Sequence, residues 1–266
     1  MSKRPIGVFD SGVGGLSILK ALRAELPFED FVYVADSGFA PYGERDENFV
    51  LARARAITRH LLKRQPAIQA LVIACNTATA AAVAVLRQDF AHLPIIGVEP
   101  ALKPAMALSR TQRIGVMATR GTLNSQKFQA LLKTLAHQVE FICQPCDGLA
   151  DAIERNDTAQ INALCAQYTQ AIGRFGTQPG EVDTLVLGCT HYPFASPCLQ
   201  ALVGPDVRLV DTGDAVARQT RRMLSSLASD TAAARCLLLS TGDPDLLQSA
   251  ATRWLGLDVP VQPLQF

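Results

Sequence analysis

The sequence predicts an α/β protein made of two similar domains, each a mostly parallel sheet flanked by helices. Short apolar strands alternate with amphipathic helices along the chain, which is typical of βαβ units. Residues 114–119 (IGVMAT) repeat the form of residues 6–11 (IGVFDS) after 108 positions, and Cys189 follows Cys75 after 114. Landmarks that recur in one order at nearly equal offsets indicate an internal duplication. We therefore expect two related halves with a cleft between them.

Composition narrows the class of protein and its compartment. The chain has 266 residues, 48% of them hydrophobic and 18% charged, and its net charge of +1 gives no basic excess that would indicate a nucleic-acid partner. No apolar run is long enough for a membrane span, and the N-terminal residues lack the apolar core of a signal peptide. The seven cysteines are too sparse for a disulfide scaffold. We therefore expect a cytoplasmic protein with free thiols.

The first half should begin with a strand at 6–9, a glycine-rich turn, and a helix with Leu16, Leu19 and Leu22 on one face. Further strands are expected at 31–34, 71–74 and 95–98, and a helix at 77–90. A helix over 46–65 is expected to bury Phe49, Ala52, Ala56, Ile57, His60 and Leu61. Its basic residues are interpreted as a solvated face rather than a binding patch: Arg53, Arg55, Arg59, Lys63 and Arg64.

The second half repeats this alternation and is followed by a C-terminal segment. Strands are expected at 114–119, 139–143, 185–188 and 207–210, and helices from 123, at 149–155, 159–175 and 195–202. The C-terminal segment should hold a helix at 214–227, a strand at 236–240 and a last helix that ends near 255. No low-complexity linker separates the halves.

Polar and nucleophilic residues follow the predicted strands directly. In a parallel sheet, ligands bind beyond the carboxyl ends of the strands, where Asp10, Ser11, Cys75, Asn76 and Glu99 fall. Cys75 and Cys189 each end a strand and precede a candidate helix N-terminus, which stabilises a thiolate. His191 lies two residues beyond Cys189, at a spacing that suits relay of the thiol proton. Two matched thiols suit the removal of a proton from one face of a carbon and its return to the other.

The glycine-rich turn 10–15 (DSGVGG) fits neither the dinucleotide fingerprint nor the P-loop, although a nucleotide remains a less favoured alternative. Its N–H groups and the Ser11 hydroxyl suit a carboxylate, which would leave Asp10 free to bind an ammonium group or to assist a thiol. Most polar residues at the strand ends are neutral donors, a set that suits a small zwitterion. They are Ser11, Asn76, Thr77, Thr119 and Thr190.

Other chemistry has less support. The four histidines are scattered, so no metal site is expected, and no lysine has the surroundings of a pyridoxal phosphate Schiff base. The C-x-x-C at 143–146 is interpreted as chance spacing. Cys165, Cys198 and Cys236 are interpreted as packing residues.

The motifs together resemble the glutamate racemase family of the aspartate/glutamate racemase superfamily. They run nearly from end to end: IGVFDSGVGGLSIL, Asp36 with PYG at 41–43, ACNTATA around Cys75, GVEPALKPA, LGCTHYPF around Cys189 and VDTGDAVA. The resemblance implies two α/β domains related by a pseudo-twofold axis, one of residues 1–98 plus 210–266 and one of 99–209, with the active site in the cleft between them. It implies no cofactor, L- and D-glutamate as substrates, supply of D-glutamate for peptidoglycan synthesis, and often a homodimer.

By the same resemblance, Cys75 and Cys189 are the two acid/base groups, with Cys189 acting on L-glutamate and Cys75 on D-glutamate. Asp10 and His191 match residues that assist the thiols. The family also has an auxiliary carboxylate, here Glu154, although Asp147 replaces the usual proline nearby and Asp151 is an alternative. The residues that match substrate-holding positions are Asp10, Ser11, Pro41, Tyr42, Gly43, Asn76, Thr77, Thr119, Thr190 and His191.

Two other functions stay open. A sister racemase for aspartate or another acidic amino acid would keep the same thiols, because side-chain length is decided by the shape of the pocket. A non-catalytic two-domain binding protein would carry structural cysteines, and it would lack unusually reactive thiols at Cys75 and Cys189.

Overall fold

The computed structural model describes residues 4–224 and 234–265. The chain divides into two compact units, one within residues 1–98 and 213–266 and the other within 99–212. The domain boundaries expected from the sequence stay a prediction. The end of the helix expected at 214–227 lies outside the described residues, and its described part, α10, covers Gly213–Met223.

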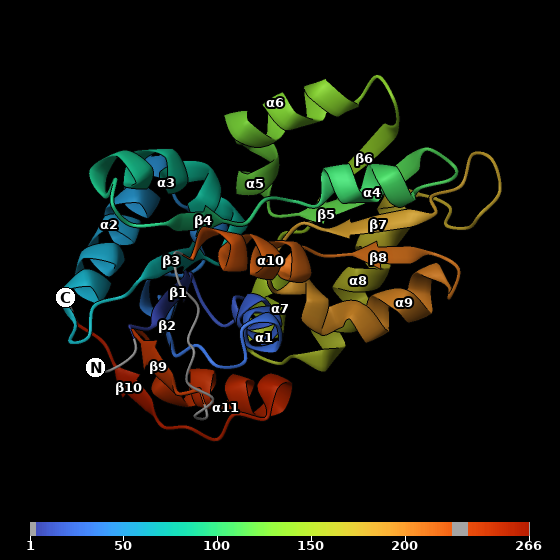
Figure 1. The fold of residues 1–266 in the computed structure, drawn as a ribbon. Helices are drawn as coiled ribbons and strands as arrows, with labels where there is room; N and C mark the ends of the chain where they lie inside the picture. Colours follow the sequence, from blue (N-terminus) through green and yellow to red (C-terminus); the bar gives the residue numbers. More distant parts are fainter. Residues whose placement is uncertain (1–3, 225–233, 266) are drawn as a thin grey trace. The chain divides into compact units, whose positions relative to one another are not determined.

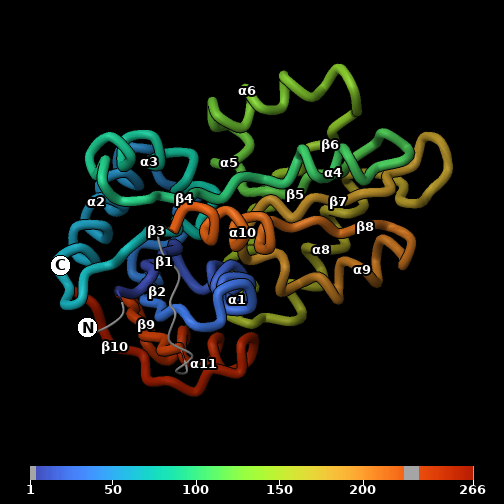
Figure 2. The backbone as a smooth tube through the Cα atoms, viewed as in Figure 1, coloured from blue at the N-terminus to red at the C-terminus, as the bar shows by residue number. Residues whose placement is uncertain are grey.

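The first unit contains a six-stranded parallel sheet in the order β10-β9-β2-β1-β3-β4 (Figure 1). Its C-terminal strands extend the sheet at the β2 edge, so the end of the chain returns to the unit that contains its beginning (Figure 2). The strands are β1 (Ile6–Asp10), β2 (Phe31–Ala35), β3 (Ala70–Ile73), β4 (Ile95–Gly97), β9 (Cys236–Ser240) and β10 (Val261–Pro263).

Helices cover both faces of this sheet. The helices α2 (Glu47–Lys63) and α3 (Asn76–Asp89) contact each other and bury side chains against one face. The helix α1 (Leu16–Glu25) packs against α10 and α11 (Pro244–Leu255) on the other. The short 3₁₀ helices η1 (Ser37–Phe39) and η2 (Tyr42–Glu44) follow β2. The carboxyl ends of β1, β2 and β3 therefore carry the loops that hold the candidate residues.

The second unit contains a four-stranded parallel sheet in the order β6-β5-β7-β8. Helices again lie on both faces. The strands are β5 (Arg113–Ala118), β6 (Glu140–Pro145), β7 (Thr184–Leu187) and β8 (Arg208–Val210). The helices are α4 (Leu102–Leu108), α5 (Arg120–Asn124), α6 (Gln126–Leu135), α7 (Leu149–Glu154), α8 (Thr158–Ile172), η3 (Tyr192–Ala195) and α9 (Ser196–Val203).

The two units share one strand order and one register. The order β2-β1-β3-β4 in the first unit corresponds to β6-β5-β7-β8 in the second. Ile6 pairs with Phe31 and Ala70, and its counterpart Ile114 pairs with Phe141 and Thr184. The predicted fold class, two α/β units with parallel sheets flanked by helices, is confirmed. This repeated register is what an internal duplication predicts.

Helix α2 differs from its expected pattern. Ala52 is exposed, so the expectation that it faces inward was wrong, whereas Phe49, Ala56 and His60 are half-buried. Placing Arg53 on a solvated face was also wrong, because its guanidinium binds the buried Asp36 carboxylate. Position 53 lies three residues after the buried Val50 and four before the buried Ile57, which puts it on the inward stripe. The number of basic residues on the helix does not show which of them faces inward.

None of the helices within 4–224 and 234–265 has the length and apolar character that a membrane crossing requires.

The helix expected from 123 is instead two helices, α5 and α6, which meet at Ser125. The Ser125 hydroxyl accepts from Phe128 N at 3.2 Å and thereby starts α6 anew.

We expect Leu71→Ala to lower the free energy of unfolding by about 2–5 kcal/mol, because Leu71 is fully buried in an interior strand. Urea unfolding followed by circular dichroism measures the change. The control Leu246→Ala removes a side chain that is 43% exposed and should change the stability by less than about 0.5 kcal/mol. Equal losses in the two variants would contradict the core assigned to this unit.

Candidate functional site

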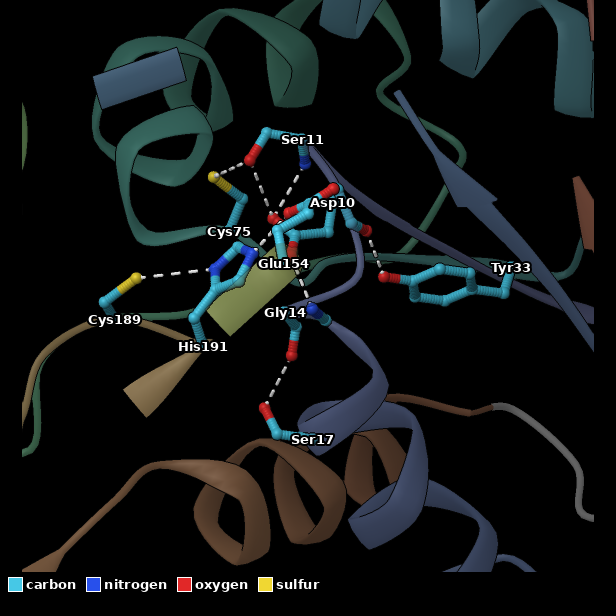
Figure 3. Close-up of polar contacts among 11 residues, drawn as sticks. Asp10, Ser11, Gly14, Ser17, Tyr33, Cys75, Glu154, Cys189 and His191 are labelled. Carbon is cyan, nitrogen blue, oxygen red and sulfur yellow. Dashed lines mark hydrogen bonds and ion pairs between the residues drawn. The ribbon is translucent and has the colours of Figure 1, made fainter. Parts of the chain in front are cut away.

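The turn after β1 is organised around the Asp10 carboxylate. This fully buried group accepts hydrogen bonds from the Ser11 amide at 2.7 Å, the Ser11 hydroxyl at 3.3 Å and the Gly15 amide (Figure 3). The sequence suggested that these donors would bind a foreign carboxylate and leave Asp10 free. In this structure the carboxylate held by the Ser11 and Gly15 amides is the one from Asp10, which stabilises the start of α1.

Two side-chain hydroxyl groups hold the turn through its backbone carbonyls. The Tyr33 hydroxyl donates to the Gly12 carbonyl at 2.7 Å, and the Ser17 hydroxyl donates to the Gly14 carbonyl at 2.9 Å (Figure 3). A Cβ on Gly15 would lie 2.7 Å from the Asp10 Cβ and 2.9 Å from the Tyr33 hydroxyl. Glycine is therefore required at position 15, because any side chain would push the carboxylate away from its donors.

Cys75 lies at the start of α3 and caps that helix with its side chain. Its Sγ accepts from the Ala78 amide at 3.4 Å and lies 3.9 Å from the Ser11 hydroxyl oxygen (Figure 3). The residue is buried. A thiolate in this position faces the positive end of the helix dipole and the Ala78 amide. The first unit thus brings together Cys75, Ser11 and Asp10.

The other candidates of the first unit lie on adjacent segments. Asn76 and Thr77 open α3 directly after Cys75. The PYG loop, residues 41–43, includes the first residues of η2. Its Tyr42 is buried and donates to Asp36 at 2.5 Å. Burial and the neighbouring Asp36 carboxylate raise the pKa of Tyr42, which keeps its hydroxyl protonated.

In the second unit, Cys189 follows β7 after Gly188 and is joined to a histidine and a carboxylate. The Cys189 Sγ lies 3.7 Å from His191 Nδ1, and His191 Nε2 lies 2.7 Å from Glu154 Oε2 (Figure 3). His191 and Cys189 are buried, and Glu154 is the last residue of α7. A nucleophile, a base and a carboxylate that orients the base form the arrangement of a catalytic triad.

The charge on His191 is favoured by both neighbours. Burial opposes that charge, but hydrogen bonds to the Cys189 sulfur and to the Glu154 carboxylate outweigh it and raise the pKa of His191 well above 6.5. A protonated imidazole beside the sulfur stabilises a thiolate. His191 is therefore paired directly with the Cys189 sulfur on one side and with the Glu154 carboxylate on the other.

The two carboxylates considered as auxiliary groups are placed differently. Glu154 contacts His191, whereas Asp151 forms an exposed ion pair with Arg155 at 2.8 Å. Asp147, where the family usually has proline, pairs with the exposed Arg120 at 2.5 Å. The family spacing indicated Glu154 and left Asp151 as an alternative, and the contact with His191 supports Glu154.

The corresponding strand ends of the two units have matching backbones but carry different side chains. Thr119 corresponds to Ser11 and caps α5 by accepting from the Thr122 amide at 3.2 Å. The position that corresponds to Asp10 holds Ala118, so this half has no carboxylate there. The buried Thr190 lies between Cys189 and His191. Each thiol therefore has its own kind of polar partner, Ser11 with Asp10 in one unit and His191 with Glu154 in the other.

The sequence did not indicate the structural roles of two residues at this edge. Tyr33 falls in the strand expected at 31–34, and Arg53 was expected on a solvated helix face. Helical spacing could have indicated Arg53, while nothing in the sequence around Tyr33 marks its contact with Gly12. Among residues 4–224 and 234–265, no group of three or more His, Cys, Asp or Glu side chains is arranged to hold a metal ion.

These features define a class of protein: an α/β chain of two repeated units, each with a thiol at the end of the corresponding strand. The family model described as Asp/Glu/Hydantoin racemase matches residues 8–220. The chain belongs to this racemase family.

Individual relatives extend over nearly the whole chain. It is 48% identical to a glutamate racemase from Ectopseudomonas mendocina, over 96% of both chains. A crystal structure of a glutamate racemase isoform from Bacillus anthracis has a TM-score of 0.86 and 30% identity, over 98% of this chain and 97% of the other. The Escherichia coli glutamate racemase, solved with L-glutamate and the activator UDP-MurNAc-ala, has a TM-score of 0.83 and 30% identity, over 98% of each chain.

Proposed function

We propose that the chain interconverts L- and D-glutamate, without a cofactor, by acid/base catalysis with Cys75 and Cys189. The observation that carries the proposal is the 48% identity to a glutamate racemase over 96% of both chains. Both thiols at the repeated strand ends support it. D-glutamate for peptidoglycan synthesis, a cytoplasmic location and a homodimer belong to the same proposal.

The reaction needs one base and one acid on opposite faces of Cα. One cysteine, as thiolate, takes the α-proton, and the other, as thiol, gives a proton to the opposite face. The roles are exchanged in the reverse direction. By the family pattern, Cys189 deprotonates L-glutamate and Cys75 deprotonates D-glutamate. The equilibrium constant between enantiomers is one, so both thiols must be able to act as base.

The Cys189 thiolate is prepared by its neighbours. His191 accepts the thiol proton at Nδ1, and the Glu154 carboxylate, at 2.7 Å from Nε2, holds the imidazole in place and stabilises its charge. When Cys189 acts as acid, the same pair can return the proton. This coupling explains why the site uses a histidine with a raised pKa.

Cys75 is connected to a carboxylate through a hydroxyl group. Its Sγ lies 3.9 Å from the Ser11 hydroxyl, which lies 3.3 Å from Asp10 Oδ1. Asp10 can therefore assist Cys75 through Ser11 while it keeps its hydrogen bonds to the Ser11 and Gly15 amides. The dipole of α3 stabilises the Cys75 thiolate in addition.

The α-hydrogen of an ionised amino acid is a very weak acid, so the carbanion needs strong support. Desolvation and hydrogen bonds to the substrate carboxylates must supply it. The residues proposed to hold the substrate are Asp10, Ser11, Pro41, Tyr42, Gly43, Asn76, Thr77, Thr119, Thr190 and His191.

The test is to incubate the purified protein with L-glutamate in D₂O without added cofactor. Circular dichroism and the α-proton signal are followed together. We expect the optical activity to decay to zero while deuterium enters Cα. If deuterium enters aspartate but not glutamate, the protein is a sister racemase. If neither amino acid takes up deuterium, a binding protein is favoured.

We expect Glu154→Gln to lower kcat about tenfold, because the imidazolium loses a charge-assisted hydrogen bond. The matched control is Asp151→Asn, on the same helix and in an exposed ion pair, which should leave kcat within about twofold. Steady-state kinetics in both directions measure this. The opposite order of effects would make Asp151 the auxiliary carboxylate.

A further inference from the structure

A buried carboxylate beneath the PYG loop joins three separate segments of the first unit. Asp36, fully buried after β2, accepts from the Tyr42 hydroxyl at 2.5 Å. It accepts from Arg53 of α2 at 2.9 Å through Nε and at 2.8 Å through a terminal nitrogen. It also accepts from the Thr241 hydroxyl, after β9, at 2.8 Å. We call Asp36, Tyr42, Arg53 and Thr241 the Asp36 cluster.

The cluster holds the segment between β2 and η2 at both ends. The Arg53 guanidinium carbon lies 3.5 Å from the centroid of the Phe39 ring in η1, while Tyr42 of η2 binds the same carboxylate as Arg53. The Arg53–Asp36 pair has two parallel bonds, which fix its orientation as well as its position. The Asp36 amide donates to the Asp10 carbonyl at 2.9 Å, so the cluster also continues into the turn after β1.

The C-terminal segment closes the cluster from the other side. The Thr241 hydroxyl also lies 3.2 Å from the Gly38 amide, and the Thr241 amide donates to the Ala35 carbonyl at 3.0 Å. A Cβ on Gly38 would lie 2.6 Å from the Thr241 carbonyl oxygen, and one on Gly242 would lie 2.9 Å from the Gly38 amide. Two backbones meet here with no room for side chains. This close approach explains the glycines at positions 38 and 242.

The loop that the cluster fixes lies beside a candidate catalytic thiol. Helix α3, which Cys75 caps, contacts η2, and Cys75 and Tyr42 belong to one buried cluster. Holding a polar loop rigid before the substrate arrives lowers the entropy cost of binding.

We propose that Asp36, Arg53 and Thr241 are positioning residues that hold the PYG loop in its substrate-binding form. This inference rests on the proposed function. None of the three is required to touch the substrate; they act through Tyr42 and the loop backbone. A loss of the cluster should therefore raise KM for both enantiomers and leave kcat nearly unchanged.

The mildest test is the pair Thr241→Val and Thr241→Ser. Valine keeps the shape and removes the hydroxyl bond to Asp36, whereas serine keeps that hydroxyl. We expect KM for L- and D-glutamate to rise about three- to tenfold in Thr241→Val, with kcat within about twofold, and to stay near the wild-type value in Thr241→Ser. Equal KM values in both variants and the wild type would overturn the proposal, as would an equal rise in both variants.

The stronger test changes the cation. Arg53→Met should raise KM at least about tenfold, and Arg53→Lys should restore part of the affinity, because lysine supplies the charge without the two-bond geometry. The matched control is Arg55→Met on the same helix, which breaks an exposed pair with Asp89 and should leave KM unchanged. Circular dichroism and a thermal melt check folding. If Arg53→Met does not fold, the Thr241 pair decides.

The outcomes separate the two proposals. A wild-type protein that does not racemise glutamate overturns the proposed function. An active wild type whose Arg53→Met and Thr241→Val forms keep the wild-type KM overturns the positioning role alone. An effect on kcat without one on KM would also contradict that role.

Discussion

Cys75→Ser and Cys189→Ser should each lower kcat for racemisation at least about 10³-fold in both directions, a rise in the barrier of about 4 kcal/mol. A serine hydroxyl is a far weaker acid than a thiol, so its alkoxide is not populated near neutral pH. Each turnover needs one thiolate and one thiol. Loss of either group therefore blocks both directions, although the two cysteines lie in different repeats.

The measurement is the decay of optical activity from L- and from D-glutamate, with binding of each enantiomer followed separately by calorimetry. Binding should be largely retained, because serine keeps the size of the side chain. Cys236→Ser is the matched control, since Cys236 lies on β9 and has no part in the proposed chemistry. Retention of a tenth of the wild-type rate in either site variant would contradict two-thiol catalysis.

The sequence predicted the fold well where local pattern and tertiary packing agree. Strands β1, β3, β5 and β7 are apolar runs between turns, and their repetition at offsets of 108 and 114 indicated the duplication. Short elements were less predictable. α4 and β10 were not predicted, because α4 contains Pro104 and β10 has only 3 residues, too few for an alternating pattern.

The sequence predicted those site residues whose chemical type alone suggests a catalytic role. The cysteines and His191 stand out because few other roles suit them at strand ends. The contact between Glu154 and His191 is set by how α7 packs, and spacing left Asp151 open. The use of Arg53 as a buried partner of Asp36 depends on which face of α2 lies inward and on the position of Phe39. Helical spacing can show that Arg53 faces inward, but it does not identify Asp36 as the partner.

His191→Asn should lower kcat about 100-fold at neutral pH, the second largest effect that we expect. The amide keeps the approximate size of the imidazole but cannot accept the Cys189 proton or carry charge. The wild-type imidazole holds its proton above the usual pH range for histidine because its pKa is raised. Without it, Cys189 loses the neighbouring base that takes its proton. The rate of the variant should therefore rise more steeply than the wild-type rate between about pH 7 and 9.

The same raised pKa predicts how stability changes with pH. A group that binds its proton more tightly in the folded state stabilises that state fully below its unfolded pKa of about 6.5, and the contribution is lost as the pH rises through the folded value. The difference in melting temperature between wild type and His191→Asn should thus be larger near pH 6 than near pH 9. His137→Asn, at an exposed position, is the control and should show no such trend. A difference that grows with pH would mean that His191 is folded in its neutral form, and the thiolate–imidazolium pair would then have to be abandoned.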